Sequence, residues 1–181
     1  MITTRENSEY KENRIYREWG SLFEDLHGRL SKSEEDRLDE KALRLQYNLS
    51  VTNSQATVTK IFNSNFDFTL YKKLTLFLFV RDKATHTNQR FVLRLGNAPD
   101  RYYEWKIPLG GISTAAEATA AGKKKWHKVD VLLDPDDGSK KFHIMVDDTD
   151  YGPAVTTPKQ PNLREINRST LGIDSRDALE P

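Results

Sequence analysis

The sequence contains no cysteine among its 181 residues, so disulfide bonds, thiolate metal sites and cysteine nucleophiles are excluded. It also lacks any apolar run near the ~20 residues that a helix needs to cross a bilayer, and we therefore expect a chain that does not itself span a membrane. An excess of one charge is missing as well, because 28 Lys and Arg face 27 Asp and Glu, for a net charge of +1. That balance gives no electrostatic reason to expect nucleic acid as a partner.

The first forty residues differ in pattern from the rest. Residues 1–13 are polar and lack an apolar core, so we expect a disordered tail and no signal peptide in this chain. Residues 14–40 are predicted to form an amphipathic helix and then a charged connector. The helical stripe consists of Ile15, Trp19, Leu22, Phe23, Leu26 and Leu30. This helix is expected either to cover an edge of the following domain or to dock on a partner.

Residues 41–175 alternate apolar and polar side chains with the period of two that is typical of β-strands, and residues 176–181 form a second tail. The pattern is strongest in residues 73–109. There the predicted core-facing sets are Leu74, Leu76, Leu78 and Val80; Phe91, Leu93 and Leu95; and Tyr103, Trp105, Ile107 and Leu109. The small-residue stretch 110–122 is expected to be a loop. Many short strands without intervening helices predict an all-β fold, with an antiparallel, galactose-binding-like jelly-roll β-sandwich as the leading topology.

No catalytic signature is present, and we expect a protein that is not an enzyme. The four histidines are scattered without metal-binding spacing, so no metal or general-base role is assigned to them. An acidic cluster is consistent with ordinary turn chemistry, and a structural calcium ion is the alternative. The cluster comprises Asp134, Asp136, Asp137, Asp147, Asp148 and Asp150. No other cofactor is expected.

The aromatic residues support the sharpest binding hypothesis. Sugar-binding β-sandwiches stack pyranose rings on exposed Trp and Tyr side chains. The favoured interpretation places Tyr103, Trp105 and Trp126 in the core, whereas Tyr102 lies on the opposite face beside Glu104. In the alternative function, a carbohydrate-binding module, the candidate ligand-binding residues are Tyr102, Glu104 and Trp126.

Five segments occur in the order found in a known family. They are ALRLQYN (42–48), DFTLYKKLTLFLF (67–79), RLGNAPDRYYEWKIPL (94–109), WHKVDVL (126–132) and PNLREINRSTLGI (161–173). In this order the chain resembles the SprA family, large outer-membrane proteins of gliding motility and type nine protein secretion. The insert at 110–122 departs from the family pattern.

The resemblance implies a non-catalytic β-sandwich module of the cell envelope, periplasmic or on the cell surface, beside a translocation channel rather than forming it. Its expected partners are other proteins or the remainder of a larger outer-membrane protein, with a glycan as the alternative ligand.

Overall fold

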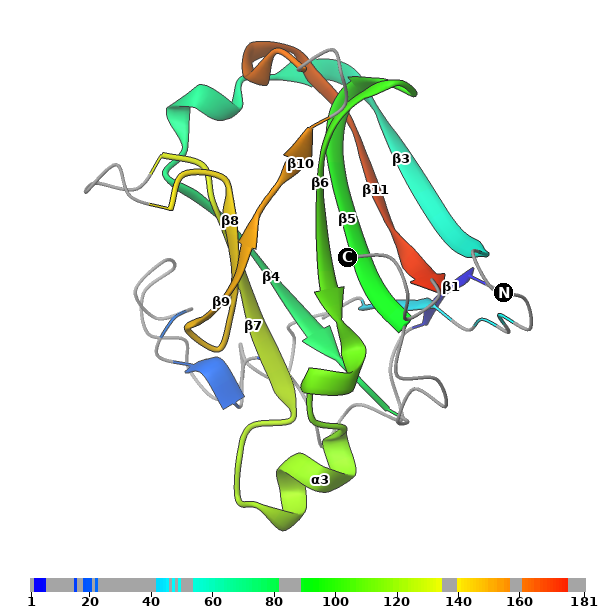
Figure 1. The fold of residues 1–181 in the computed structure, drawn as a ribbon, viewed down its shortest axis with the longest axis vertical. Coiled ribbons are helices and arrows are strands. Elements are labelled where there is room, and N and C mark those ends of the chain that lie inside the picture. Colours follow the sequence, from blue (N-terminus) through cyan, green and yellow to red (C-terminus); the bar gives the residue numbers. More distant parts are fainter. Residues whose placement is uncertain are drawn as a thin grey trace, which may run out of the picture.

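The computed structural model describes residues 2–5, 15, 18–20, 22, 42–45, 47, 49, 54–81, 89–134, 140–156 and 161–175. Two antiparallel sheets dominate this part of the chain, as a β-sandwich requires (Figure 1). The five-stranded sheet has the order β10 (Val155–Thr156), β6 (Arg101–Pro108), β5 (Gln89–Ala98), β11 (Ile166–Ser175) and β3 (Gln55–Phe66). The four-stranded sheet has the order β4 (Lys73–Phe79), β7 (Trp126–Leu132), β8 (His143–Val146) and β9 (Thr149–Pro153).

The core lies between the two sheets and follows the predicted alternation. Leu93 and Trp105 are each 1% exposed, and Ile107 is fully buried. Trp105 also donates a hydrogen bond from Nε1 to the Phe142 carbonyl oxygen at 2.7 Å, so its one polar group is satisfied inside the core. Tyr103 stacks on the Phe142 ring, with centroids 4.7 Å apart. The interpretation of Tyr103 and Trp105 as core residues is confirmed.

A third, two-stranded sheet joins β1 (Ile2–Arg5) to β2 (Ala42–Leu45) in antiparallel register. β1 lies within residues 1–13, for which a disordered tail was expected. The strand is rich in β-branched residues, which favour strands. β2 falls at the start of the region 41–175, which was expected to form the sandwich, but it pairs with β1 in a separate sheet. Tyr47 and Leu49, just beyond β2, pack against the sandwich core.

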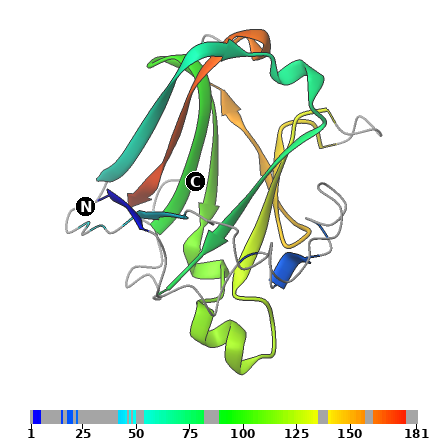
Figure 2. The same ribbon diagram turned by 180° about the vertical axis from the view of Figure 1, so that it is seen from behind.

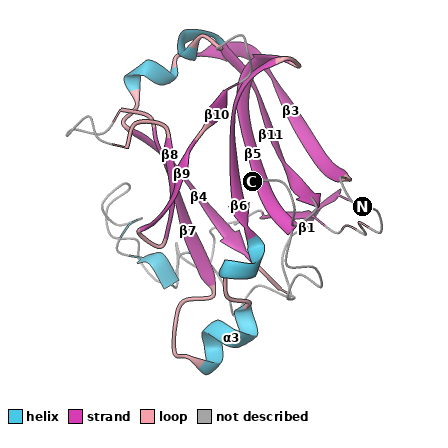
Figure 3. Cartoon of the chain, viewed as in Figure 1, coloured by secondary structure: helices cyan, strands magenta, loops and turns pink. Residues whose placement is uncertain are grey.

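The stretch 110–122 contains helix α3 (Ala115–Ala120), so the prediction of a loop throughout was wrong there (Figure 3). A capping box explains the helix: the Thr114 side chain accepts a hydrogen bond from the Glu117 backbone N–H, and the Glu117 carboxylate accepts one from Thr114 N–H. The alanines between and beyond these residues are strong helix formers. Three 3₁₀ turns complete the described elements, namely η1 (Phe68–Leu70), η2 (Leu109–Gly111) and η3 (Leu163–Glu165).

Ile15, Leu22 and the segment 18–20 are helical, within the range predicted for the amphipathic helix, and the rest of that range lies outside the described residues. This helical segment lies against the four-stranded sheet (Figure 2). The Trp19 ring contacts Phe77 of β4 at a centroid distance of 5.7 Å, and Trp19 Nε1 donates to the Trp126 carbonyl oxygen at 3.0 Å. Within the described part of the chain, no helix is long and apolar enough to cross a membrane.

Candidate functional site

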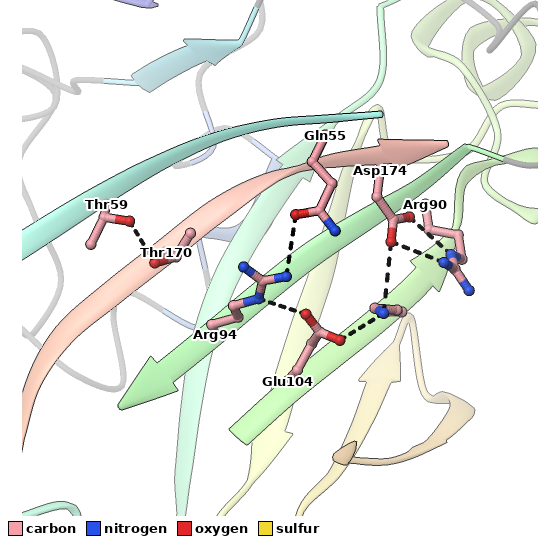
Figure 4. Close-up of polar contacts among 8 residues, drawn as sticks. Gln55, Thr59, Arg90, Arg94, Glu104, Thr170 and Asp174 are labelled. Carbon is pink, nitrogen blue, oxygen red and sulfur yellow. Dashed lines mark hydrogen bonds and ion pairs between the residues drawn. The ribbon is translucent and has the colours of Figure 1, made fainter. Parts of the chain in front are cut away.

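Two of the three predicted ligand-binding residues, Tyr102 and Glu104, share the outer face of the five-stranded sheet, the face turned away from the core. Figure 4 shows Glu104 among its polar neighbours on this face. Residues paired across neighbouring strands lie on the same face, which places the side chains in rows across the sheet. One row runs Thr59, Thr170, Arg94 and Glu104, and a parallel row runs Gln55, Asp174 and Arg90. Polar and charged side chains therefore gather on a surface that the sequence predicts to face solvent.

Glu104 is held by two cations on this face. Its carboxylate accepts a hydrogen bond from Arg94 Nε at 2.5 Å and lies 2.6 Å from Lys106 Nζ. Burial by itself raises the pKa of Glu104, but the hydrogen bonds and charges of Lys106 and Arg94 outweigh it, and the pKa falls below its ordinary value. Glu104 is therefore an ionised carboxylate whose charge is balanced by Arg94 and Lys106, rather than a free general acid or base.

Asp174 forms the second anionic centre and is 1% exposed. Arg90 donates to it from two nitrogens, Nε to Oδ1 and Nη2 to Oδ2, each at 2.9 Å. Such a bidentate ion pair is among the strongest side-chain contacts. Lys106 Nζ lies 3.7 Å from Asp174 Oδ2 and so connects the two centres. We call Arg90, Arg94, Glu104, Lys106 and Asp174 the outer-face network.

Tyr102 lies at the end of this network and is half-buried. The Arg94 guanidinium carbon lies 4.8 Å from the centroid of its ring, a cation–π contact. Opposite Tyr102 stands Gly96, where an added Cβ would come within 2.2 Å of the Arg101 carbonyl oxygen and 2.8 Å of Tyr102 Cβ. Tyr102 therefore depends on a glycine to approach the neighbouring strand and already carries a cation on its ring.

The outer face is also shielded at its centre. Val92 alternates with the core residues Phe91 and Leu93, so its side chain points away from the core, yet it is fully buried. A platform that stacks sugar rings needs accessible aromatic faces. The surface around Val92 does not offer an open platform.

Trp126, the third predicted residue, belongs to the other sheet. It is 6% exposed, and its ring lies 5.0 Å from that of Phe79. The helical segment contacts its backbone, because Glu18 Oε2 accepts hydrogen bonds from both Lys125 N–H and Trp126 N–H, at 2.8 and 2.9 Å. The structure thus brings Tyr102 and Glu104 together and places Trp126 on a different sheet.

A further polar cluster joins residues that are far apart in the sequence and was missed by sequence reasoning. His127 Nδ1 lies 2.6 Å from Asp147 Oδ2, and His127 Nε2 lies 2.9 Å from the Ser113 carbonyl oxygen and 3.4 Å from Ser113 Oγ. Although the residue types are those of a serine hydrolase, the closer partner of Nε2 is a carbonyl oxygen, which can only accept. Nε2 must then donate, and it is not placed to remove the hydroxyl proton. The cluster ties the β8–β9 turn to Ser113, two residues before α3.

The acidic residues of the predicted cluster do not converge on one point within the described ranges. Asp134 pairs with Lys141 at 3.0 Å, and the His143 Nδ1 atom lies 3.0 Å from Asp150. Asp147 and Asp148 both have positive φ, 45° and 67°, as the central residues of a tight hairpin turn do. Asp136 and Asp137 lie outside the described residues. No group of three or more metal-ligating side chains occurs in the part of the chain that is described.

Three of the six exposed large apolar side chains in the described residues lie together at one end of the sandwich. Phe66 at the end of β3 is 44% exposed, Leu70 in η1 is 78% exposed and Tyr71 is 56% exposed. A chain of ring contacts runs along this end, from Phe62 to Phe66 at 4.9 Å, Phe66 to Phe68 at 6.4 Å and Phe68 to Tyr71 at 6.1 Å. We call Phe62, Phe66, Phe68, Leu70 and Tyr71 the aromatic strip. The sequence does contain a signal for this strip, namely the high density of aromatic residues over 62–71. Sequence reasoning interpreted these residues only as parts of strands and turns.

Comparison with known proteins gave no match: no family model, no curated protein and no solved structure matches the chain. The resemblance to the SprA family therefore stays a prediction.

Proposed function

We propose that this chain is a non-catalytic β-sandwich module that acts through protein contacts, with the aromatic strip as a contact surface. The exposure of Leu70, Phe66 and Tyr71 at one end of the sandwich carries the proposal. A contiguous patch of exposed apolar side chains often marks a site of interaction with another protein. Aromatic residues are also enriched at protein interfaces.

The charged groups support a non-catalytic role. Glu104 and Asp174 are each paired with basic side chains of the same sheet, and His127 is occupied by Asp147 and the Ser113 carbonyl. A catalytic acid or base needs a pKa and a geometry suited to proton transfer. These groups are instead arranged as structural bonds.

The wider setting is proposed on the order of sequence segments alone: an envelope module, periplasmic or on the cell surface, of an outer-membrane secretion or gliding-motility protein similar to the SprA family. We also propose a jelly-roll topology for the sandwich. Its support is the repeated crossing of the chain between the sheets, from β3 to β4, β4 to β5, β6 to β7 and β9 to β10.

A polysaccharide titration tests this function against the alternative of a carbohydrate-binding module. The chain is titrated with a panel of soluble glucans, xylans and chitin oligosaccharides while tryptophan fluorescence and heat are recorded. We expect no saturable binding, because Trp105 and Trp126 are buried and Arg94 covers the Tyr102 ring. Saturable binding that the Tyr102→Ala variant loses would overturn the proposed function in favour of sugar recognition.

A further inference from the structure

Strand β3 is a long strand at the edge of the five-stranded sheet. It spans 12 residues, Gln55–Phe66, and among the described residues it pairs on one side only, with β11. Most of its side chains are exposed, and Ile61 is 62% exposed. The free side of such a strand presents a row of backbone N–H and C=O groups that another strand can pair with. Figure 1 shows β3 at the margin of the sheet.

The strand lacks most of the features that block edge pairing. It contains neither proline nor glycine, and its only charged residue is Lys60. Its pairing with β11 is regular from Gln55 to Ile61, and the irregularity falls beyond that, between Ile166 and Arg168 of β11. Residues 55–61 therefore form an edge with a regular register, and we call this stretch the β3 edge.

The β3 edge is held firmly on its neighbour. Thr59 Oγ1 and Thr170 Oγ1 share a hydrogen bond of 2.7 Å across the two strands. At Gly172 of β11 an added Cβ would lie 2.4 Å from the Ala56 carbonyl oxygen, so the strands approach more closely than a side chain would allow. A strand fixed in its extended form before binding loses little conformational entropy when a partner arrives.

The charge of the β3 edge indicates what its partner must supply. Lys60 is exposed and has no ion-pair partner among the described residues, and the strand carries no acidic residue. Arg168 of β11 is paired with Ile61 and therefore lies on the opposite face of the sheet from Lys60. A second copy of this strand would bring another Lys60 and no carboxylate, so it would leave the positive charge unbalanced.

We propose that the β3 edge binds an extended, acidic segment of a partner protein by strand addition. In the complex, a carboxylate of the segment lies beside Lys60 and a β-branched side chain lies beside Ile61. Main-chain hydrogen bonds supply affinity in this mode of recognition, and the alternate side chains supply specificity. The inference rests on the proposed function, since it names a partner class for a module that acts through protein contacts.

Three fluorescein-labelled peptides test the proposal on the whole chain. The first has the sequence Ser-Val-Thr-Glu-Val-Thr-Val-Ser, the second carries Lys in place of Glu, and the third is the first with every backbone amide nitrogen methylated. Fluorescence anisotropy should show saturable binding of the acidic peptide, about 10-fold tighter than that of the lysine peptide, because cross-strand charge pairs reverse sign. The methylated peptide should not bind, since methylation removes the backbone donors of both edges.

Two variants locate the binding surface. Lys60→Glu should reverse the preference between the acidic and the lysine peptide, whereas Lys123→Glu, an exposed lysine after α3, should leave it unchanged. Amide chemical shifts in the unaltered chain should move in residues 55–61 on addition of the acidic peptide. Thermal unfolding of both variants serves as the folding control.

Absence of saturable binding, equal binding of the methylated peptide, or a preference that Lys60→Glu does not alter would overturn the proposal. Formation of a dimer through β3 at the concentrations used would also overturn it, because a second copy would then be the occupant. None of these results changes the outcome expected in the polysaccharide titration. Failure of the β3 edge alone therefore leaves the proposed function in place, with its contact on another surface.

Discussion

The outer faces of the two sheets are closed off in different ways. On the five-stranded sheet the outer-face network fills the surface with paired charges, and Asp174 is 1% exposed within it. On the four-stranded sheet an aromatic pair, Phe79 and Trp126, is covered by the helical segment through Glu18 and Trp19. Both faces show the alternation of a half-exposed sheet in the sequence. A polar residue at an outward position is therefore no sign of an open surface, and neither is an outward tryptophan.

The largest effect is expected at the buried carboxylate of the charged face. Asp174→Ala leaves Arg90 without its two-pronged partner, and removing one member of a buried ion pair costs about 3 kcal/mol. Urea unfolding of the variant should show this loss in the free energy of unfolding. Asp100→Ala, at an exposed side chain, is the matched control and should change stability by less than about 0.5 kcal/mol. Equal effects of the two substitutions would show that the network does not stabilise the fold.

On the aromatic face, Trp19→Ala should cost about 2 kcal/mol, since Trp19 is half-buried and loses its contacts with Phe77 and the Trp126 carbonyl. The Trp126 side chain should become accessible to solvent at the same time. Acrylamide quenching of the Trp19→Ala/Trp105→Phe protein against the Trp19→Phe/Trp105→Phe protein, each of which keeps Trp126 as its one tryptophan, measures that change. Unchanged quenching would mean that Trp19 does not cover this face.

Acid should weaken the charged face selectively. The pKa of Glu104 is lowered in the folded chain, so its contribution is present above the pKa of the unfolded chain, near 4.5, and is lost as the pH falls through the lower folded value. Glu104→Gln removes this titration and should cost about 1 kcal/mol at neutral pH. Thermal midpoints between pH 3 and pH 7 should show a smaller acid-induced drop in the variant. A drop of the same size in both proteins would assign acid sensitivity to other groups.

The smallest effect is expected at Tyr102. Tyr102→Ala removes the cation–π contact with Arg94 and should cost about 0.5 to 1 kcal/mol. Tyr102→Phe keeps the ring and is the matched control, with a smaller loss in the same urea titration. If the phenylalanine variant loses as much as the alanine variant, the hydroxyl and not the ring is what Tyr102 contributes.

The alternation of side chains was enough to predict the core. Leu93, Leu95 and Trp105 point inward because strand geometry leaves them no alternative once one neighbour is placed. Thr114 and Glu117 show a signal that was present but unread, since their spacing is that of a capping box. The strand order was beyond a local pattern, because β11 lies between β5 and β3 although it is last in the chain.

The candidate site was less accessible to sequence reasoning than the core. Tyr102 and Glu104 are two residues apart on one strand, so their shared face could be predicted. The contact of Asp174 with Arg90 joins residues 84 positions apart, and the cover over Trp126 comes from residues more than 100 positions away. Such contacts depend on the assembled sheets and leave no spacing in the sequence.

Site-specific photo-crosslinking tests the central claim most directly, that the aromatic strip contacts a partner and the outer-face network serves the fold. A benzophenone amino acid replaces Leu70 in one variant and Tyr102 in another. Each variant is expressed in cells of the source organism, and the cells are then irradiated. We predict protein adducts from position 70 and none from position 102. Adducts from position 102 with none from position 70 would contradict the central claim.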